Sequence, residues 1–462
     1  MKPLVYIFAL AVILSCQTKK EKEPSAESVP AKNITFMTLD PGHFHAALVQ
    51  KTAYPNVNDT IYVYAPEGPE VDDFLDKIAQ YNTRMDAPTN WKPVLYIGAD
   101  YLDKMISNKA GNVMVVAGKN AKKIDYILEA VRAGLHVYAD KPLVIHPEGF
   151  KKLSEAFRIA DEKGVFIYDI MTERFEATTM LQKAFSGIPS VFGSLIDGSP
   201  DKPAISKESV HHFYKQVSGK PLVRPAWFFD VNEEGEGIVD VTTHLVDLVQ
   251  WELFPNEIID TSDIKMIHAK RWATTVRKDE FTKVTGLPDF PEFLDKDSDG
   301  DHINVYSNGE MVYTIKGKHA KVSVIWNYEA PEGAGDTHYS VLRGTKSDLI
   351  IKQGEAENYK PTLYINFKEN TESVSMALDE ALNEVIATNF PGTSAVQISD
   401  TMWRINIPDA FHIGHEAHFA QVTQNYLQYL NEGALPVWEV PNMLSKYYTT
   451  VEAFKIAREQ KQ

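Results

Sequence analysis

Short apolar runs alternate with helical patterns from residue 33 to residue 170, and this alternation restricts the fold more than any other feature of the chain. Short, continuous apolar runs fit strands that are buried on both faces of a sheet. The alternation therefore predicts a parallel, doubly wound sheet that is covered by helices. The expected strands are 34–39, 60–64, 94–97, 112–117, 135–139 and 165–169, and the expected helices lie after residue 46 and at 71–78, 121–133 and 147–163.

Beyond residue 171 the pattern changes to segments in which apolar and polar residues alternate. This period of two predicts a large, mostly antiparallel sheet, so the whole chain is expected to be α/β. Ser307-Asn308-Gly309 is a turn sequence that we expect between two of these strands. We place one domain at 33–170 and a second at 171–462. The expected strands are 303–306, 311–315, 320–326 and 339–343, and the expected last helices are 415–430 and 443–458.

The N-terminus carries an export pattern. Lys2 precedes the apolar run 4–14, which is too short to span a bilayer and is followed by Ser15-Cys16. This end resembles the lipobox of bacterial lipoproteins, which implies that 1–16 is a signal peptide and that Cys16 is lipidated. Residues 17–32 read as a flexible tether. We therefore expect an exported protein that is anchored by lipid to a bacterial membrane, in the periplasm or on the cell surface.

Composition excludes several kinds of chemistry. Cys16 is the single cysteine, so the mature chain has no internal disulfide and no thiolate for catalysis or metal binding. Lys and Arg number 47 against 63 Asp and Glu, and the net charge of -16 argues against a nucleic-acid partner. No second apolar run is long enough to span a membrane, so the lipid is the expected membrane contact.

Ligands of an open parallel sheet bind beyond the carboxyl ends of its strands, so the first turn is a candidate site. It reads Asp40-Pro41-Gly42-His43-Phe44-His45 and departs from G-x-G-x-x-G, because Asp40 and His45 take the outer positions. Its imidazoles either donate to a phosphate or cap and pack the turn. Glu67, after the second strand, either grips a ribose or is a solvated loop residue. The candidate cofactor-binding residues here are Gly42, His43, Phe44, His45 and Glu67.

A second group of polar residues lies near position 240. On a helix, Asp240, His244, Asp247 and Trp251 fall on one line, so Asp240 is expected to orient His244. A histidine of near-neutral pKa is suited to accept a hydroxyl proton. The other reading of this line is a solvated polar face.

Several separated stretches resemble the Gfo/Idh/MocA family of oxidoreductases. Residues 112–141 are similar to the family's fourth strand, crossover helix and fifth strand, with Asp140-Lys141-Pro142 where the family usually has Glu-Lys-Pro. Residues 235–247 are similar to its glycine-rich turn and following helix, and Arg174 stands where family members often carry an arginine. The resemblance covers 34–255 well and 256–462 more loosely.

The resemblance implies an N-terminal Rossmann domain that binds NAD or NADP, and a hydride transfer to or from a secondary hydroxyl of a sugar, glycoside or polyol. Lys141 is then the active-site lysine, its pKa expected to fall with burial, and His244 is the base. The altered first turn and Gly118-Lys119-Asn120, which lacks the usual Thr-Pro-Asn, depart from the family. The further cofactor candidates are Ala117, Gly118, Asn120, Asp140, Lys141 and Arg174; the catalytic residues are Lys141, His244 and Asp240; and the substrate residues are Lys141, Thr243, His244 and Asp247.

Two other functions use the same scaffold. Some relatives oxidise a sugar transiently and then cleave its glycosidic bond by elimination, which would make the chain an NAD-dependent glycoside hydrolase. A non-catalytic, exported carbohydrate-binding protein is the third reading, because free dinucleotide is scarce outside the cytoplasm. The broad second sheet is also a plausible surface for a homo-oligomer.

Two weaker patterns favour no metal. Asp295, Asp297 and Asp299 copy the start of a calcium loop, but its twelfth position is Tyr306, so we interpret them as an acidic turn. His412, His415 and His418 with Glu416 fit no zinc-binding H-E-x-x-H spacing and are either substrate-facing or structural.

Overall fold

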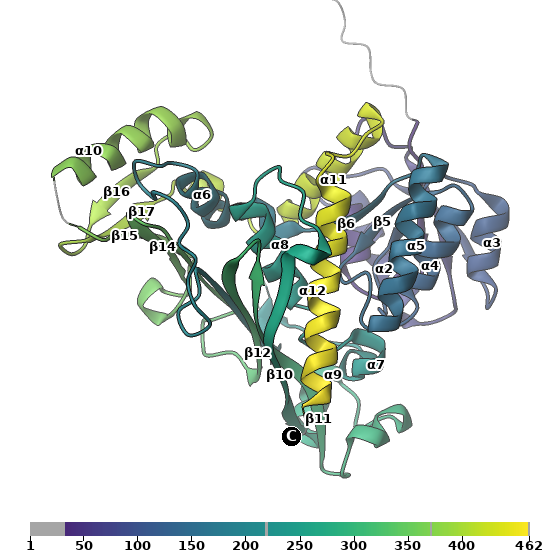
Figure 1. Ribbon diagram of the computed structural model, residues 1–462. Helices are drawn as coiled ribbons and strands as arrows, with labels where there is room; N and C mark the ends of the chain where they lie inside the picture. Colours follow the sequence, from purple (N-terminus) through teal and green to yellow (C-terminus); the bar gives the residue numbers. More distant parts are fainter. Residues whose placement is uncertain (1–32, 218–219, 370–371, 461–462) are drawn as a thin grey trace, which may run out of the picture.

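The computed structural model describes residues 33–217, 220–369 and 372–460 (Figure 1). The predicted signal peptide, Cys16 and the tether lie outside the described residues. Of the helices in the described ranges, none is both long and apolar enough to cross a membrane.

The N-terminal half forms the expected parallel sheet. Its six strands are ordered β3-β2-β1-β4-β5-β6, and every neighbouring pair is parallel. β1, β4 and β6 are buried along their whole length, because helices cover both faces of the sheet. The strands are β1 (Phe36–Leu39), β2 (Thr60–Ala65), β3 (Lys92–Ile97), β4 (Val113–Val116), β5 (His136–Asp140) and β6 (Ile167–Ile170), and the helices are α1 (His45–Val49), α2 (Pro69–Thr83), α3 (Tyr101–Asn108), α4 (Lys123–Arg132) and α5 (Pro147–Lys163).

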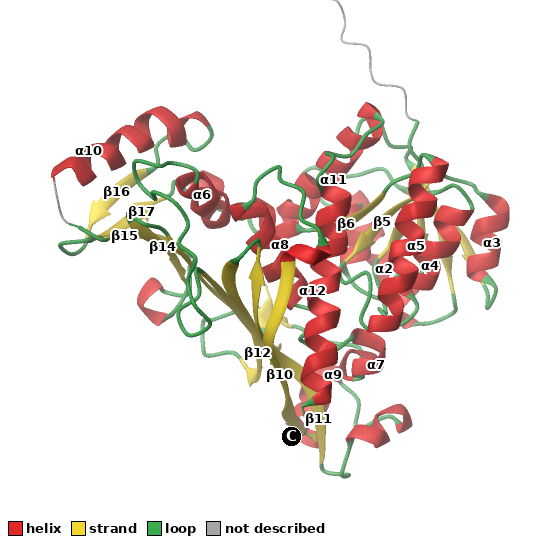
Figure 2. Cartoon of the chain, viewed as in Figure 1, coloured by secondary structure: helices red, strands yellow, loops and turns green. Residues whose placement is uncertain are grey.

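The C-terminal half is built on a sheet of nine strands, ordered β10-β11-β12-β7-β13-β14-β15-β17-β16. All its pairs are antiparallel except β12 with β7. Helices α6 (Ala177–Ser186) and α8 (Thr242–Leu253) pack on it (Figure 2). The strands are β7 (Ile205–Tyr214), β10 (Ile264–Arg277), β11 (His302–Ile315), β12 (Lys318–Glu329), β13 (Thr337–Arg343), β14 (Ser347–Lys352), β15 (Thr362–Phe367), β16 (Ser394–Gln397) and β17 (Met402–Asn406).

The turn expected at Ser307-Asn308-Gly309 is wrong, because these residues lie inside β11. A Cβ on Gly309 would lie 2.5 Å from Cβ of Ile238, so this glycine lets the segment before α8 approach the strand. Asn308 bonds across the sheet, since its Nδ2 donates to the Trp272 carbonyl at 3.1 Å and its Oδ1 accepts from the Trp326 amide at 2.7 Å. Asn308 and Gly309 therefore allow close packing within the sheet and do not reverse the chain direction.

The two last helices, α11 (His415–Glu432) and α12 (Glu439–Glu459), return to the first sheet. Phe419 and Tyr426 of α11 join the apolar core on one face, and Met443 and Tyr447 of α12 join the core on the other. Figure 1 shows α12 running between the two halves of the molecule. The sequence boundary near residue 171 separates the two sheets, but the C-terminal helices complete the first one.

Candidate active site

The turns after β1 and β4 pack backbone against backbone. The amide of His43 donates to the carbonyl of Ala117 at 3.2 Å. A Cβ on Gly118 would lie 2.5 Å from the carbonyl oxygen of Asp40 and 2.9 Å from the amide nitrogen of Gly42. Gly118 therefore has to be glycine for these turns to meet at the switch point of the sheet.

A small pocket lies beside these turns, at the carboxyl ends of β1 and β2. This is where a Rossmann domain holds the adenosine half of a dinucleotide, and an acid there grips the ribose. Two acids line the pocket, Asp40 after β1 and Glu70 at the start of α2, whereas Glu67 is exposed and is not among the lining residues. Of the two acids that follow β2, Glu70 lines this pocket, so it joins Glu67 as a candidate for the ribose contact.

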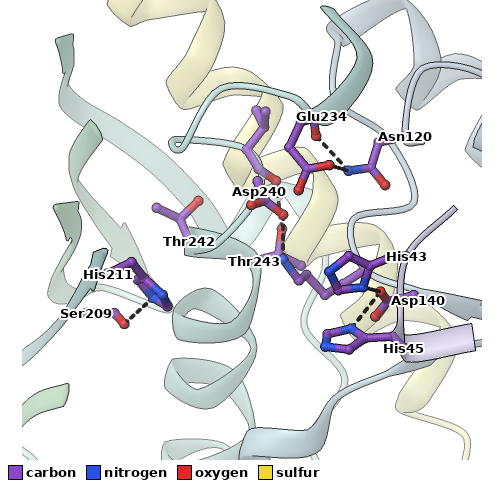
Figure 3. Close-up of polar contacts among 12 residues, drawn as sticks. His43, His45, Asn120, Asp140, Ser209, His211, Glu234, Asp240, Thr242 and Thr243 are labelled. Carbon is purple, nitrogen blue, oxygen red and sulfur yellow. Dashed lines mark hydrogen bonds and ion pairs between the residues drawn. The ribbon is translucent and has the colours of Figure 1, made fainter. Parts of the chain in front are cut away.

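Imidazoles replace glycines in the remainder of the first turn. His45 Nδ1 lies 2.9 Å from Oδ2 of Asp140, and His43 Nδ1 lies 3.7 Å from the same oxygen (Figure 3). Burial, together with the charge of His45, lowers the pKa of His43 well below its ordinary value. Burial opposes the ionisation of Asp140, but the charge and hydrogen bond of His45, with the charge of Lys123, outweigh burial and hold the pKa of that carboxyl below its usual range. Phe44, between the imidazoles, is exposed.

Lys141 follows β5 and forms an ion pair with Asp240. Both side chains are largely buried, with exposures of 12% and 7%. Burial lowers the pKa of Lys141, but the charges of Asp240 and Asp140 outweigh it, so the net shift is upward. The expectation of a lowered pKa for Lys141 is wrong, because two carboxylates accompany the ammonium group.

His244, in α8, is within range of the charge of Lys141. Burial lowers the pKa of His244 well below its ordinary value, and the charge of Lys141 lowers it further. Its Nδ1 is buried and has no hydrogen-bond partner among the described residues. The expectation that Asp240 orients His244 is wrong, because Asp240 precedes α8 and its carboxylate is paired with Lys141.

Three residues that were expected to bind ligands form hydrogen bonds within the protein. Arg174 donates two hydrogen bonds of 2.7 Å to the carboxylate of Asp247 and one of 2.8 Å to Glu439. Asp247 also accepts from Lys446 at 2.8 Å, and the Thr243 hydroxyl donates to the Val239 carbonyl at 2.9 Å. These contacts disagree with a cofactor role for Arg174 and with substrate roles for Thr243 and Asp247.

A segment that includes α7 (Val231–Glu234) closes over the turn after β4. The amide of Asn120 donates to the Glu233 carbonyl at 2.8 Å, and its Nδ2 donates to the Glu234 carbonyl at 2.6 Å. Asn120 thus holds this segment. Burial and the charge of Asp240 raise the pKa of Glu234 well above its ordinary value, which favours its neutral form.

The sequence analysis missed Lys123, which is fully buried beneath the site. Its Nζ donates to Asn120 Oδ1 at 2.5 Å and to the backbone carbonyl of Asp140 at 2.9 Å. Burial lowers the pKa of Lys123 to about 8. Helical lysines are almost always exposed, so nothing in the local pattern distinguishes this one.

A chain of hydrogen bonds on the large sheet, from Ser209 through His211 to Asp336, was also not predicted from the sequence. Ser209 Oγ lies 2.6 Å from His211 Nε2, and His211 Nδ1 lies 2.9 Å from Oδ2 of Asp336. Ser209 and His211 alternate along β7 with Lys207, which pairs with Glu252 of α8, so all three face that helix. In Figure 3, Thr242 lies between this pair and Asp240, the residue that pairs with Lys141.

The late histidines and the acidic turn of the sequence analysis form no common site. His415 lies with its ring 5.6 Å from that of His45, whereas His418 is buried and His412 is exposed. Asp299 Oδ1 accepts from the amides of Asp301 and His302, which agrees with an acidic turn. In the described chain, the cluster with metal-ligand spacing is His43, His45 and Asp140.

Two family models match the chain. "Oxidoreductase family, NAD-binding Rossmann fold" matches residues 44–168, and "Putative oxidoreductase C terminal domain" matches residues 181–458. The chain belongs to the Gfo/Idh/MocA family of oxidoreductases. The expected family and fold class are therefore confirmed.

Solved structures agree with this assignment. A crystal structure of a "putative oxidoreductase" from Parabacteroides merdae is 51% identical, covers 94% of this chain and 99% of its own, and has a TM-score of 0.91. A 3-ketoreductase from Actinomadura kijaniata, in complex with NADP and TDP-benzene, is 12% identical over 92% of this chain and 97% of its own, with a TM-score of 0.55.

A levoglucosan dehydrogenase in complex with NADH is also 12% identical, over 92% of this chain and 97% of its own, with a TM-score of 0.57. At this identity the two enzymes share the fold with our chain. No curated protein matches the chain.

Proposed function

We propose that the protein is an NAD-dependent oxidoreductase that moves a hydride between the nicotinamide and a secondary hydroxyl of a sugar, glycoside or polyol. The observation that carries this proposal is the largely buried Lys141, which follows β5 and pairs with Asp240, and whose charge, together with burial, lowers the pKa of His244 in α8. Two distant structural neighbours also support a nicotinamide-dependent enzyme. The 3-ketoreductase is in complex with NADP and TDP-benzene, and the levoglucosan dehydrogenase is in complex with NADH.

The roles of the residues follow from their protonation states. In the oxidation direction, Lys141 donates a hydrogen bond to the reacting oxygen and stabilises its developing negative charge. Neutral His244 accepts the hydroxyl proton. The carbon–hydrogen electron pair leaves as hydride, for which the bound nicotinamide is the acceptor, and a carbonyl remains. Asp240 keeps Lys141 charged and in place.

The lowered pKa of His244 gives a pH prediction. A base with a lowered pKa becomes protonated at a lower pH than usual, so kcat/KM for sugar oxidation should stay on its plateau as pH falls through 6.5. Initial rates measured over this range test the prediction. An acid limb centred at 6.5 that His244→Gln removes would contradict it.

Glu70 gives a prediction for cofactor choice. A carboxylate in the adenosine pocket accepts hydrogen bonds from a ribose and repels a 2′-phosphate, so NAD should bind more tightly than NADP. Glu70→Ser should lower the affinity for NAD by about tenfold or more while sparing NADP. The control is Glu67→Ser, outside the pocket, which should change neither. Equal effects of the two substitutions would contradict the assignment.

Binding and product analysis test the function itself. Purified protein should enhance the fluorescence of added reduced nicotinamide cofactor, and incubation with NAD and a panel of glycosides should give a keto product with net cofactor reduction. Cleaved glycoside without net reduction would replace this proposal with transient oxidation and elimination. Binding of sugar without any cofactor binding would replace it with a non-catalytic carbohydrate-binding protein.

We also propose that the chain is exported and anchored by lipid at Cys16. The basis is the sequence alone, the apolar run 4–14 followed by Ser15-Cys16. Cells grown with a clickable palmitate analogue should label the wild-type protein, and Cys16→Ala should lose the label and leave the membrane fraction. Label that persists in Cys16→Ala would refute the anchor.

A further inference from the structure

His43, His45 and Asp140 bring three metal-ligating atoms together at the first turn. One ligand atom from each lies within 4.8 Å of the other two. His45 Nδ1 and His43 Nδ1 lie 2.9 and 3.7 Å from Asp140 Oδ2. Ligands of a tetrahedral zinc ion at ordinary bond lengths stand about 3.4 Å apart, so small side-chain rotations would suffice for coordination.

One of the three donor atoms has no partner within the protein. His43 Nδ1 is buried and has no hydrogen-bond partner among the described residues, which leaves a polar atom unsatisfied beside a carboxylate. An imidazole nitrogen without a hydrogen-bond partner can offer its lone pair to a cation.

Neither nearby lysine forms a close ion pair with the Asp140 carboxylate. Lys141 is paired with Asp240, and Lys123 donates to the Asp140 backbone carbonyl and to Asn120. In the described chain, the ion-pair partners of this carboxylate are the imidazoles of His43 and His45. With 5% of Asp140 exposed, this carboxylate is buried, and a cation bound beside it would stabilise its charge.

From this geometry we propose that His43, His45 and Asp140 bind a divalent first-row transition-metal ion, with zinc as the reference ion. Two imidazoles and one carboxylate suit zinc, iron(II) or cobalt(II) and leave coordination positions open for water or for an oxygen of a ligand. The site takes the place of the glycine-rich turn that this chain lacks, at the edge of the sheet where Lys141 lies.

Metal titration of the purified protein tests the proposal. Chelator-treated protein is titrated calorimetrically with Zn²⁺ and then with Co²⁺, whose visible absorption reports its ligands. Wild type should bind one ion per chain, and His43→Ala, His45→Ala and Asp140→Asn should each lose roughly 100-fold or more in affinity. His412→Ala, an exposed histidine outside the cluster, is the control and should bind as wild type does.

Folding is checked by circular dichroism, and the milder His43→Asn and His45→Gln replace any alanine variant that does not fold. Wild type that binds neither ion, or binds them as the cluster variants do, would overturn the site. Neither cofactor nor substrate is present, so this outcome is independent of the proposed hydride transfer.

Discussion

Replacing Lys141 with methionine should lower kcat for sugar oxidation by about three orders of magnitude, with NAD affinity changed little. Methionine has a similar length and no charge, so the variant removes the ammonium group while filling most of its space. The reacting oxygen then loses its hydrogen bond and its counter-charge. Steady-state rates and cofactor titration on the same preparation measure the two effects separately.

This substitution leaves Asp240 buried without its partner, so stability has to be measured alongside activity. The double variant Lys141→Met with Asp240→Asn removes both charges and should recover stability but not turnover. Lys122→Met changes an exposed lysine nearby and should keep full activity. Near-wild-type turnover in folded Lys141→Met would remove Lys141 from the chemistry.

Replacing Lys446 with methionine should lower the free energy of unfolding by about 3–5 kcal/mol. Lys446 is fully buried, and its Nζ lies 2.7 Å from Asp169 Oδ2 and 2.8 Å from Asp247 Oδ1. Removing the ammonium leaves two buried carboxylates with fewer partners. Because Asp169 belongs to β6, Asp247 to α8 and Lys446 to α12, the loss loosens the contact between the two halves.

Denaturant unfolding measures this loss, and Lys455→Met on the same helix is the matched control. Lys455 is 51% exposed, and its ion-pair partner Glu452 lies 3.9 Å away, so its loss should cost less than about 1 kcal/mol. Equal costs for the two lysines would contradict the structural role assigned to the buried network.

The first sheet was predictable because each of its strands can be recognised from its own local sequence. Each is a short apolar run between a turn and a helix, and the observed strands lie at the expected segments. The return of α11 and α12 to this sheet was not predictable, because an amphipathic helix does not say which surface it covers. The turn at Gly309 was mispredicted for a similar reason. The sequence does not distinguish a glycine that is required for packing against Ile238 from a glycine in a turn.

The candidate site was predictable in its positions but not in its pairings. Lys141, Asp240 and His244 were expected together, yet the partner of Asp240 is the lysine, because the residue lies before the helix where the expected spacing no longer applies. Ser209 and His211 form one network with Asp336, which lies 125 residues after His211. Such distant pairings depend on the fold of the whole chain.

Transfer of a deuterium label tests the central claim most directly. Sugars and glycosides deuterated at their secondary carbons are incubated with NAD and the purified protein, and the cofactor is analysed by mass spectrometry. We expect deuterium on the reduced nicotinamide with wild type and almost none with Lys141→Met. Turnover of the sugar by wild type with no deuterium ever reaching the nicotinamide would contradict the proposed hydride transfer.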